Sequence, residues 1–168
     1  MTRVLVAAVG NVLRRDDGFG AAVAARLTGL PPGARVVETG IGGIGLLQEL
    51  MAGWDGLVLV DAVDRGAEPG TVFLIEPDVA EAEHVPDVHL ANPERVLMLA
   101  RGLGCLPERL LLVGCQPADA ERLGERLSRA VERAVPVAAA EVEETVRAWL
   151  EPTRRRRPPS RRVPSRRR

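Results

Sequence analysis

Two aspartates and a histidine stand where a folded chain could gather them into a site. Asp17 follows the apolar run 4–9, Asp61 follows the apolar run 56–60, and His89 precedes a predicted helix. Two carboxylates and an imidazole on separate loops are a usual way to hold a divalent metal ion while leaving coordination positions open. Asp17, Asp61 and His89 therefore predict a metal-binding site.

Each of these residues also has a purely structural interpretation. One of the acids at 16–17 could cap the helix that follows, where a carboxylate suits the helix dipole. One of the acids at 61–64 could fix the turn after its strand, and His89 could be an ordinary loop histidine. Singly, each structural interpretation is preferable. Together, the acids that follow two strands and a His89 loop that could reach the same sheet edge favour a site.

The predicted elements explain why these residues should meet. The apolar runs, turn residues and helical spacings predict strands over 3–9, 34–38, 56–60, 71–75 and 109–115, and helices over 18–27, 46–51, 93–103, 125–134 and 137–151. The link 61–70 is too short for a crossover helix, so we expect strand 71–75 to run antiparallel to strand 56–60. The fold class is α/β, a three-layer α/β/α sandwich with a mostly parallel five-stranded sheet and one antiparallel strand. Ligands of such sheets bind at the carboxyl ends of the strands.

Two common alternatives fit the sequence less well. The string of glycines at 40, 42 and 45 matches G-x-G-x-x-G but follows the second strand, where a tight turn that needs positive φ explains it equally well. The first turn holds two carboxylates, which would repel a phosphate. Ser128 is the only serine before the C-terminal tail, so no nucleophile elbow is present. Cys105 and Cys115 lack metal-ligand or redox-motif spacing, and Cys115 is predicted to be a small core residue.

The charge is divided between two parts of the chain. All 23 basic residues are arginines, nine of them in 153–168, whereas all 23 acidic residues precede Pro152. We expect one folded domain over 1–152 with a charge of −9 and a disordered, arginine- and proline-rich tail over 153–168 with a charge of +9. The acidic body argues against nucleic-acid binding, although the basic tail leaves it open. The absence of a long apolar stretch or a signal sequence predicts a cytoplasmic protein without membrane attachment.

The opening stretch "VLVAAVGNVLRRDDGFG" resembles the N-terminal signature of the hydrogenase maturation proteases. This family trims the C-terminus of the large subunit of nickel–iron hydrogenases. Three further stretches agree in order: "ETGIGGIGLLQEL", "LVLVDAVDRGAEPGTV" and "LLLVGCQPAD". The resemblance covers roughly residues 3–150 and leaves the tail outside.

The resemblance implies roles for three residues. The family's second acid before Gly-x-Gly matches Asp17, its aspartate after the third strand matches Asp61, and its histidine matches His89. In the family these residues are taken to bind nickel already loaded into the precursor, so the substrate supplies the metal. Asp17 stands where some members have the longer Glu, and "HLANPERVL" lacks the polar residue that often follows the histidine. By the same comparison, Asp16 is expected to cap or orient, and Arg14 and Arg15 to face solvent or a partner.

These observations predict an endopeptidase that removes the C-terminal extension of a nickel-loaded hydrogenase large-subunit precursor. Asp17 and Asp61 are the candidate catalytic residues. Either a metal-polarised water with a carboxylate as general base or an aspartic mechanism is compatible with them. The alternative is a non-catalytic module that senses a metal or a nucleotide on the same fold. A binder would not need all three ligand-type residues, which favours the enzyme.

Overall fold

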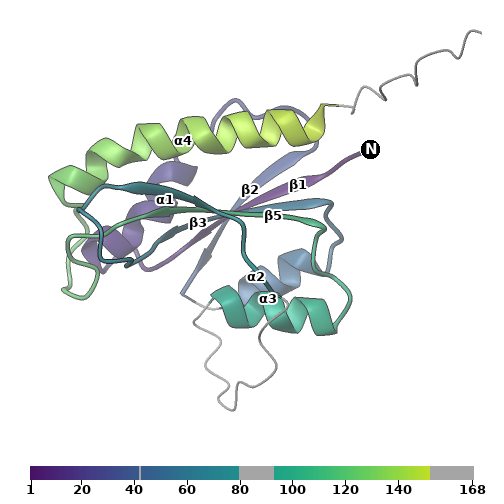
Figure 1. The fold of residues 1–168 in the computed structure, drawn as a ribbon, viewed down its shortest axis with the longest axis horizontal. Coiled ribbons are helices and arrows are strands. Elements are labelled where there is room, and N and C mark those ends of the chain that lie inside the picture. The colour runs from purple at the N-terminus through teal and green to yellow at the C-terminus, as the bar shows by residue number, and fades with distance from the viewer. Residues whose placement is uncertain (42, 80–92, 152–168) are drawn as a thin grey trace, which may run out of the picture.

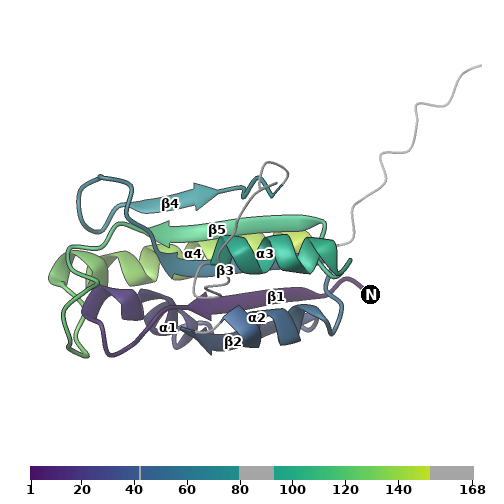
Figure 2. The ribbon, with the colours of Figure 1, turned by 90° about the horizontal axis from the view of Figure 1, so that it is seen from below.

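A single mixed sheet organises the chain (Figures 1 and 2). The computed structural model describes residues 1–41, 43–79 and 93–151. The strand order is β2-β1-β3-β5-β4. The strands are β1 (Val4–Val9), β2 (Ala34–Gly40), β3 (Gly56–Ala62), β4 (Val72–Ile75) and β5 (Arg109–Cys115). All neighbouring pairs are parallel except β4 with β5. The predicted mostly parallel sheet with one antiparallel strand is confirmed.

Helices cover both faces of this sheet. They are the short 3-10 helix η1 (Arg15–Gly18), α1 (Phe19–Ala24), α2 (Gly43–Leu50), α3 (Pro93–Gly102) and α4 (Arg129–Leu150). α1 and α4 pack on one face, and α2 and α3 on the other (Figure 1). The predicted three-layer α/β/α sandwich is therefore present. Within the described ranges, no helix combines the length and hydrophobicity needed to cross a membrane.

The two faces of β1 explain its continuous apolar sequence. Val4 and Val6 pack into the core beneath α1 and α4. Leu5 and Ala7 pack into the second core beneath α2 and α3. All four side chains are fully buried, because a central parallel strand has no solvent-facing side. Cys115 belongs to the first core, as predicted.

The register of the central strands brings two chain segments to one edge. Ala8 of β1 pairs with Val60 of β3, so the turn that follows β1 begins where β3 ends. Asp61 lies within β3, opposite Gly114 of β5, because β3 extends two residues beyond the predicted strand 56–60. The carboxyl ends of β1, β3 and β5 thus meet at the edge where the sequence predicted a site.

Some predicted elements differ in the structure. The strand 71–75 runs in the predicted direction, but its partner is β5 rather than β3, because β5 enters the sheet between them. The two predicted C-terminal helices are one helix, α4, which continues through Pro136. Proline removes one helical hydrogen bond, but burial along α4 continues on both sides of it, from Val131 to Val146, and offsets that loss. The helix predicted over 18–27 is the shorter α1, and the 3-10 helix η1, which was not predicted, precedes it.

Candidate active site

The turn after β1 fixes the position of the Asp17 carboxylate. Gly10 has φ +121°, and a Cβ there would lie 2.1 Å from the carbonyl oxygen of Asp17. This close approach lets the backbone N–H of Asn11 donate to Oδ2 of Asp17 at 2.9 Å. The Asn11 side chain in turn accepts from the N–H of Leu13 at 2.9 Å. The "GN" of the opening motif therefore forms a turn that holds Asp17 beside the end of β1.

Gly20 brings the start of α1 against the ends of two strands. A Cβ at Gly20 would lie 2.6 Å from the carbonyl oxygens of both Val9 and Val60. Any larger side chain would push α1 away from β1 and β3. Since Val60 directly precedes Asp61, this contact also sets how closely the Asp17 turn approaches Asp61.

Asp61 and Asp17 form an acid pair at this edge. Asp61 is half-buried, and its pKa is raised from 3.8 to about 7. Burial is the largest cause and the negative charge of Asp17 the second, whereas a hydrogen bond from the Ala62 backbone opposes the shift. A carboxyl group that keeps its proton up to neutral pH beside a second acid can take part in proton transfer or help to bind a cation. This is the electrostatic behaviour of many catalytic and metal-binding sites.

Asp64 has the structural role that the sequence left open. Its Oδ1 accepts from the Gly66 N–H at 3.0 Å and from Nε2 of Gln116 at 2.9 Å. These two bonds, that of Gln116 first, lower the pKa of Asp64. Asp64 therefore shapes the turn after β3, while Asp61 is the acid that interacts with Asp17.

Gln116 is a supporting residue that the sequence reasoning missed. It is 5 % exposed, and its Oε1 accepts from the backbone N–H groups of Arg65 at 2.7 Å and Ala67 at 3.2 Å. These bonds tie the turn after β3 to the end of β5. The sequence could have indicated this role, because Gln116 is the first polar residue after the apolar run 110–115 and therefore lies at the carboxyl edge of the sheet.

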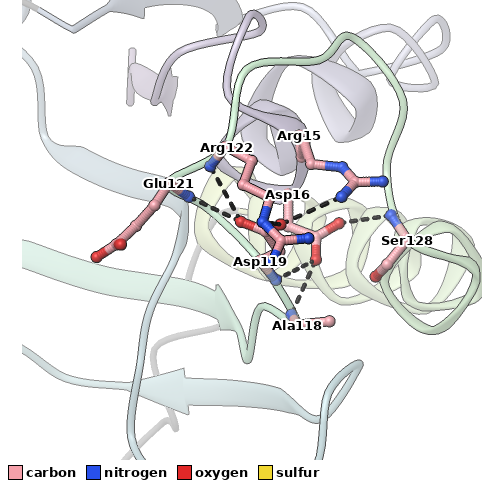
Figure 3. Close-up of polar contacts among 7 residues, drawn as sticks. All are labelled: Arg15, Asp16, Ala118, Asp119, Glu121, Arg122 and Ser128. Carbon is pink, nitrogen blue, oxygen red and sulfur yellow. Dashed lines mark hydrogen bonds and ion pairs between the residues drawn. The ribbon is translucent and has the colours of Figure 1, made fainter.

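Asp16 lies beside the pair but faces away from solvent into a separate network (Figure 3). Its carboxylate accepts from the backbone N–H groups of Ala118, Asp119 and Ser128 at 2.8, 3.1 and 2.6 Å. The helix-cap interpretation of the two acids is wrong, because the N-cap of α1 is Gly18 and no side chain caps it. The prediction that Asp16 orients the loop is consistent with these bonds.

Arg15 differs from its expected solvent- or partner-facing role. Its Nη1 forms an ion pair with Asp119 at 3.2 Å, although its side chain is still 42 % exposed. It also has φ 48°, an uncommon conformation for a residue other than glycine. Arg14, in contrast, is exposed as expected.

The third predicted ligand, His89, lies outside the described residues, as does His84, the other histidine. Across 1–41, 43–79 and 93–151, no group of three His, Cys, Asp or Glu side chains is placed to hold a metal ion. Asp17 and Asp61 are the two members of the predicted set that the structure brings together. His89 stays a prediction.

A small groove lies next to the anchored turn. Its volume is about 270 Å³, and its lining includes Gly10, Asn11 and Val12 after β1 and Gly40 and Ile41 at the end of β2. Gly40 has φ +62°, the positive φ that the predicted tight turn requires. The half-exposed Val12 and the exposed Ile41 give this groove an apolar rim.

This combination of a mostly parallel sheet and an acid pair at its carboxyl edge defines an α/β protein with a candidate site at that edge. A similar sheet occurs in the hydrogenase-maturating endopeptidase HybD of Escherichia coli, with TM-score 0.75 and 28% identity over 88% of this chain and 93% of that one. The [NiFe] hydrogenase maturation protease HycI of Thermococcus kodakarensis matches with TM-score 0.72 and 25% identity, over 87% and 93% of the two chains.

Sequence comparison agrees with the structural one. The hydrogenase expression/formation protein HupD of Rhodobacter capsulatus is 35% identical over 153 residues, which are 88% of this chain and 72% of the relative. Residues 23–145 match the family model described as hydrogenase maturation protease. The chain belongs to the hydrogenase maturation protease family. It is therefore a peptidase, which favours the predicted enzyme over the non-catalytic module.

Proposed function

We propose that this protein cleaves one peptide bond near the C-terminus of a nickel-loaded hydrogenase large-subunit precursor. The observation that carries the proposal is the Asp17–Asp61 pair at the carboxyl edge of the sheet. Because the chain belongs to the hydrogenase maturation protease family, the reaction that we assign to this pair is hydrolysis of a peptide bond. The Thermococcus relative is named as a maturation protease of a [NiFe] hydrogenase, and on that basis we propose that the nickel belongs to the substrate.

In this proposal Asp17, Asp61 and His89 bind the nickel ion that the precursor carries. Carboxylate and imidazole groups are suitable ligands for such an ion. The Asn11 N–H holds Asp17 in place before substrate arrives, so little conformational entropy is lost on binding. The metal would make the scissile region of the precursor recognisable and bring it to the acid pair.

The pair also has the proton chemistry that hydrolysis needs. In the metal-free protein Asp61 has a pKa of about 7, so it gains and loses a proton readily at neutral pH. The charge of Asp17 contributes to this value. We favour a route in which the precursor's nickel polarises the water or the carbonyl, and a carboxylate of the pair that is not coordinated to the nickel acts as the general base. In a purely aspartic route, the same two carboxyls would activate water with no contribution from the metal.

The test compares two precursors and a set of variants. Full-length protein is incubated with nickel-loaded and nickel-free precursor, and the mass lost from the precursor C-terminus is measured. We expect cleavage only of the loaded form. Asp17→Asn and Asp61→Asn should each lower the rate by orders of magnitude, whereas Asp64→Asn, a neighbouring acid with a structural role, should retain most of it.

The histidines offer a second matched comparison. We expect His89→Ala to impair processing strongly and His84→Ala to change it little. Equal cleavage of both precursors would contradict metal recognition, and unchanged rates in both aspartate variants would contradict the acid pair.

A further inference from the structure

We propose that Asp16 is a positioning residue for this reaction: its buried carboxylate locks η1 to the segment 117–128 and so holds Asp17 beside Asp61. The inference rests on the proposed function. The Asp16 side chain is 0% exposed, and we assign its effect on the reaction to the position that it gives Asp17.

The burial of Asp16 needs a specific explanation. In the part of the chain that the structure describes, it is the only charged side chain that is buried. Burying a carboxylate is costly unless hydrogen bonds replace its water. Asp16 obtains three, from Ala118, Asp119 and Ser128, and all the donors are backbone N–H groups of one segment (Figure 3). The carboxylate thus fixes the path of that segment over more than ten residues.

The contacts are reciprocal, which makes η1 and the segment 117–128 one rigid unit. The backbone N–H of Asp16 donates to the carbonyl of Asp119 at 3.1 Å, and that of Arg15 donates to Gly124 at 2.7 Å. The Gly124 N–H donates back to Leu13 at 2.9 Å. The ion pair between Arg15 and Asp119 closes the same junction on the outside.

This unit is attached at both ends to elements that are already fixed. The segment 117–128 runs from β5, which is paired with β3, to α4, which packs on the sheet. Asp17 follows Asp16 directly on η1, so a shift of Asp16 moves Asp17 relative to Asp61. A displacement of about 1 Å at a catalytic group can lower a rate about 100-fold.

Asparagine cannot replace Asp16 in this network. Oδ2 accepts from two N–H groups and Oδ1 from a third. An amide has only one accepting oxygen, so either orientation of Asn would turn an NH₂ group toward at least one backbone N–H. Asp16→Asn keeps the size of the side chain and specifically disrupts the junction.

Ser128 provides a second perturbation with a matched control. Its φ of −64° suits proline, and Ser128→Pro replaces the N–H that Asp16 binds by a ring carbon. Ser128→Ala removes only the side-chain cap of α4, a 3.4 Å bond to the Val131 N–H, and retains the N–H bonded to Asp16. Both variants lose the cap, and only the proline variant disturbs Asp16.

The experiment measures kcat and KM for processing of nickel-loaded precursor by full-length wild type, Asp16→Asn, Ser128→Pro and Ser128→Ala. Melting curves are recorded for each, and rates are measured well below every Tm. We expect Asp16→Asn and Ser128→Pro to be folded and to lose about 10- to 100-fold in kcat. Ser128→Ala should lose stability but less than twofold in kcat.

The outcomes separate positioning from general stabilisation. If the folded Asp16→Asn and Ser128→Pro proteins process at the Ser128→Ala rate, Asp16 serves stability alone and the proposal is overturned. If neither variant folds while Ser128→Ala does, the junction is required for the fold as a whole, which also overturns it. Should only Asp16→Asn fail to fold, the comparison of Ser128→Pro with Ser128→Ala decides. Wild type that leaves the precursor uncut contradicts the proposed function instead.

Discussion

Asp61→Asn should remove most of the pH dependence of stability between pH 5 and 8. Burial, and then the charge of Asp17, raise the pKa of Asp61 from 3.8 to about 7 in the folded protein. In the unfolded chain the carboxyl returns to its ordinary value. Between about pH 4 and 7 the folded state therefore holds one more proton than the unfolded state. The free energy of unfolding falls as the pH rises through this window.

The size of the effect follows from the pKa shift. Each unit corresponds to about 1.4 kcal/mol, so a shift of roughly three units costs about 4 kcal/mol by pH 8. Asparagine resembles the protonated form of Asp61 and can still accept from the Ala62 N–H. The variant should match wild type below about pH 3.8, where Asp61 is protonated in both states, and exceed it in stability at pH 8 by up to about 4 kcal/mol.

Urea unfolding of metal-free protein at pH 5, 6, 7 and 8 measures this difference. Asp17→Asn removes only the neighbouring charge, so it should keep part of the slope and move its midpoint to lower pH. Asp64→Asn is the control, because hydrogen bonds lower the pKa of Asp64 and its contribution is lost only as the pH falls below 3.8. A flat wild-type profile, or parallel profiles for wild type and Asp61→Asn, would refute the reasoning.

Three further predictions concern packing and the tail. Gly20→Ala should lower stability by about 1–3 kcal/mol and impair processing, because its Cβ would meet two backbone carbonyls. The control Gly102→Ala, whose Cβ would have nothing within 4 Å, should be neutral or slightly stabilising. Thermal unfolding compares the two variants, and equal Tm values would contradict the close approach at Gly20. Pro136→Ala should stabilise the protein by about 1–3 kcal/mol in urea unfolding, because Pro136 is exposed and alanine restores an N–H that can donate a helical hydrogen bond. A loss of stability would show that the proline has another role. Truncation after Glu151 should change the Tm by no more than a few degrees and leave the processing activity intact. Any effect of the tail on association with other molecules should weaken as the salt concentration rises. If the truncated protein loses activity at every salt concentration, the tail is needed for catalysis and the prediction is wrong.

Local patterns in the sequence determined most of the sheet. The run 109–115 predicted β5 residue for residue, and the apolar runs that became β1 and β3 predicted buried parallel strands. Such strands are recognisable because burial on both faces demands consecutive apolar residues. The glycines of the opening motif similarly indicated a tight turn into a helix. The candidate acids could be placed at one edge because parallel strands share a direction.

Pairing partners and electrostatics depended on the tertiary structure. The direction of β4 followed from a short link, but its pairing with β5 depended on which strand occupies the position beside β3. Pro136 predicts a helix break locally, and only the continuous buried face of α4 shows why the helix continues. Both outcomes depend on contacts between residues distant in sequence, which no local pattern encodes.

The different roles of the two adjacent aspartates also could not be derived from local sequence patterns. Residue type and local pattern do not distinguish Asp16 from Asp17, and only the family resemblance gave the two acids different expected roles. In the structure, Asp16 is buried against backbone N–H groups more than 100 positions away, whereas Asp17 lies on the Asn11 turn and acts on Asp61. Residue type and spacing determined that carboxylates would gather at this edge. Which carboxylate is buried, and which one perturbs the pKa of its neighbour, was decided by the folded path of segments 117–128 and 56–62, because desolvation and charge interactions depend on distance in space.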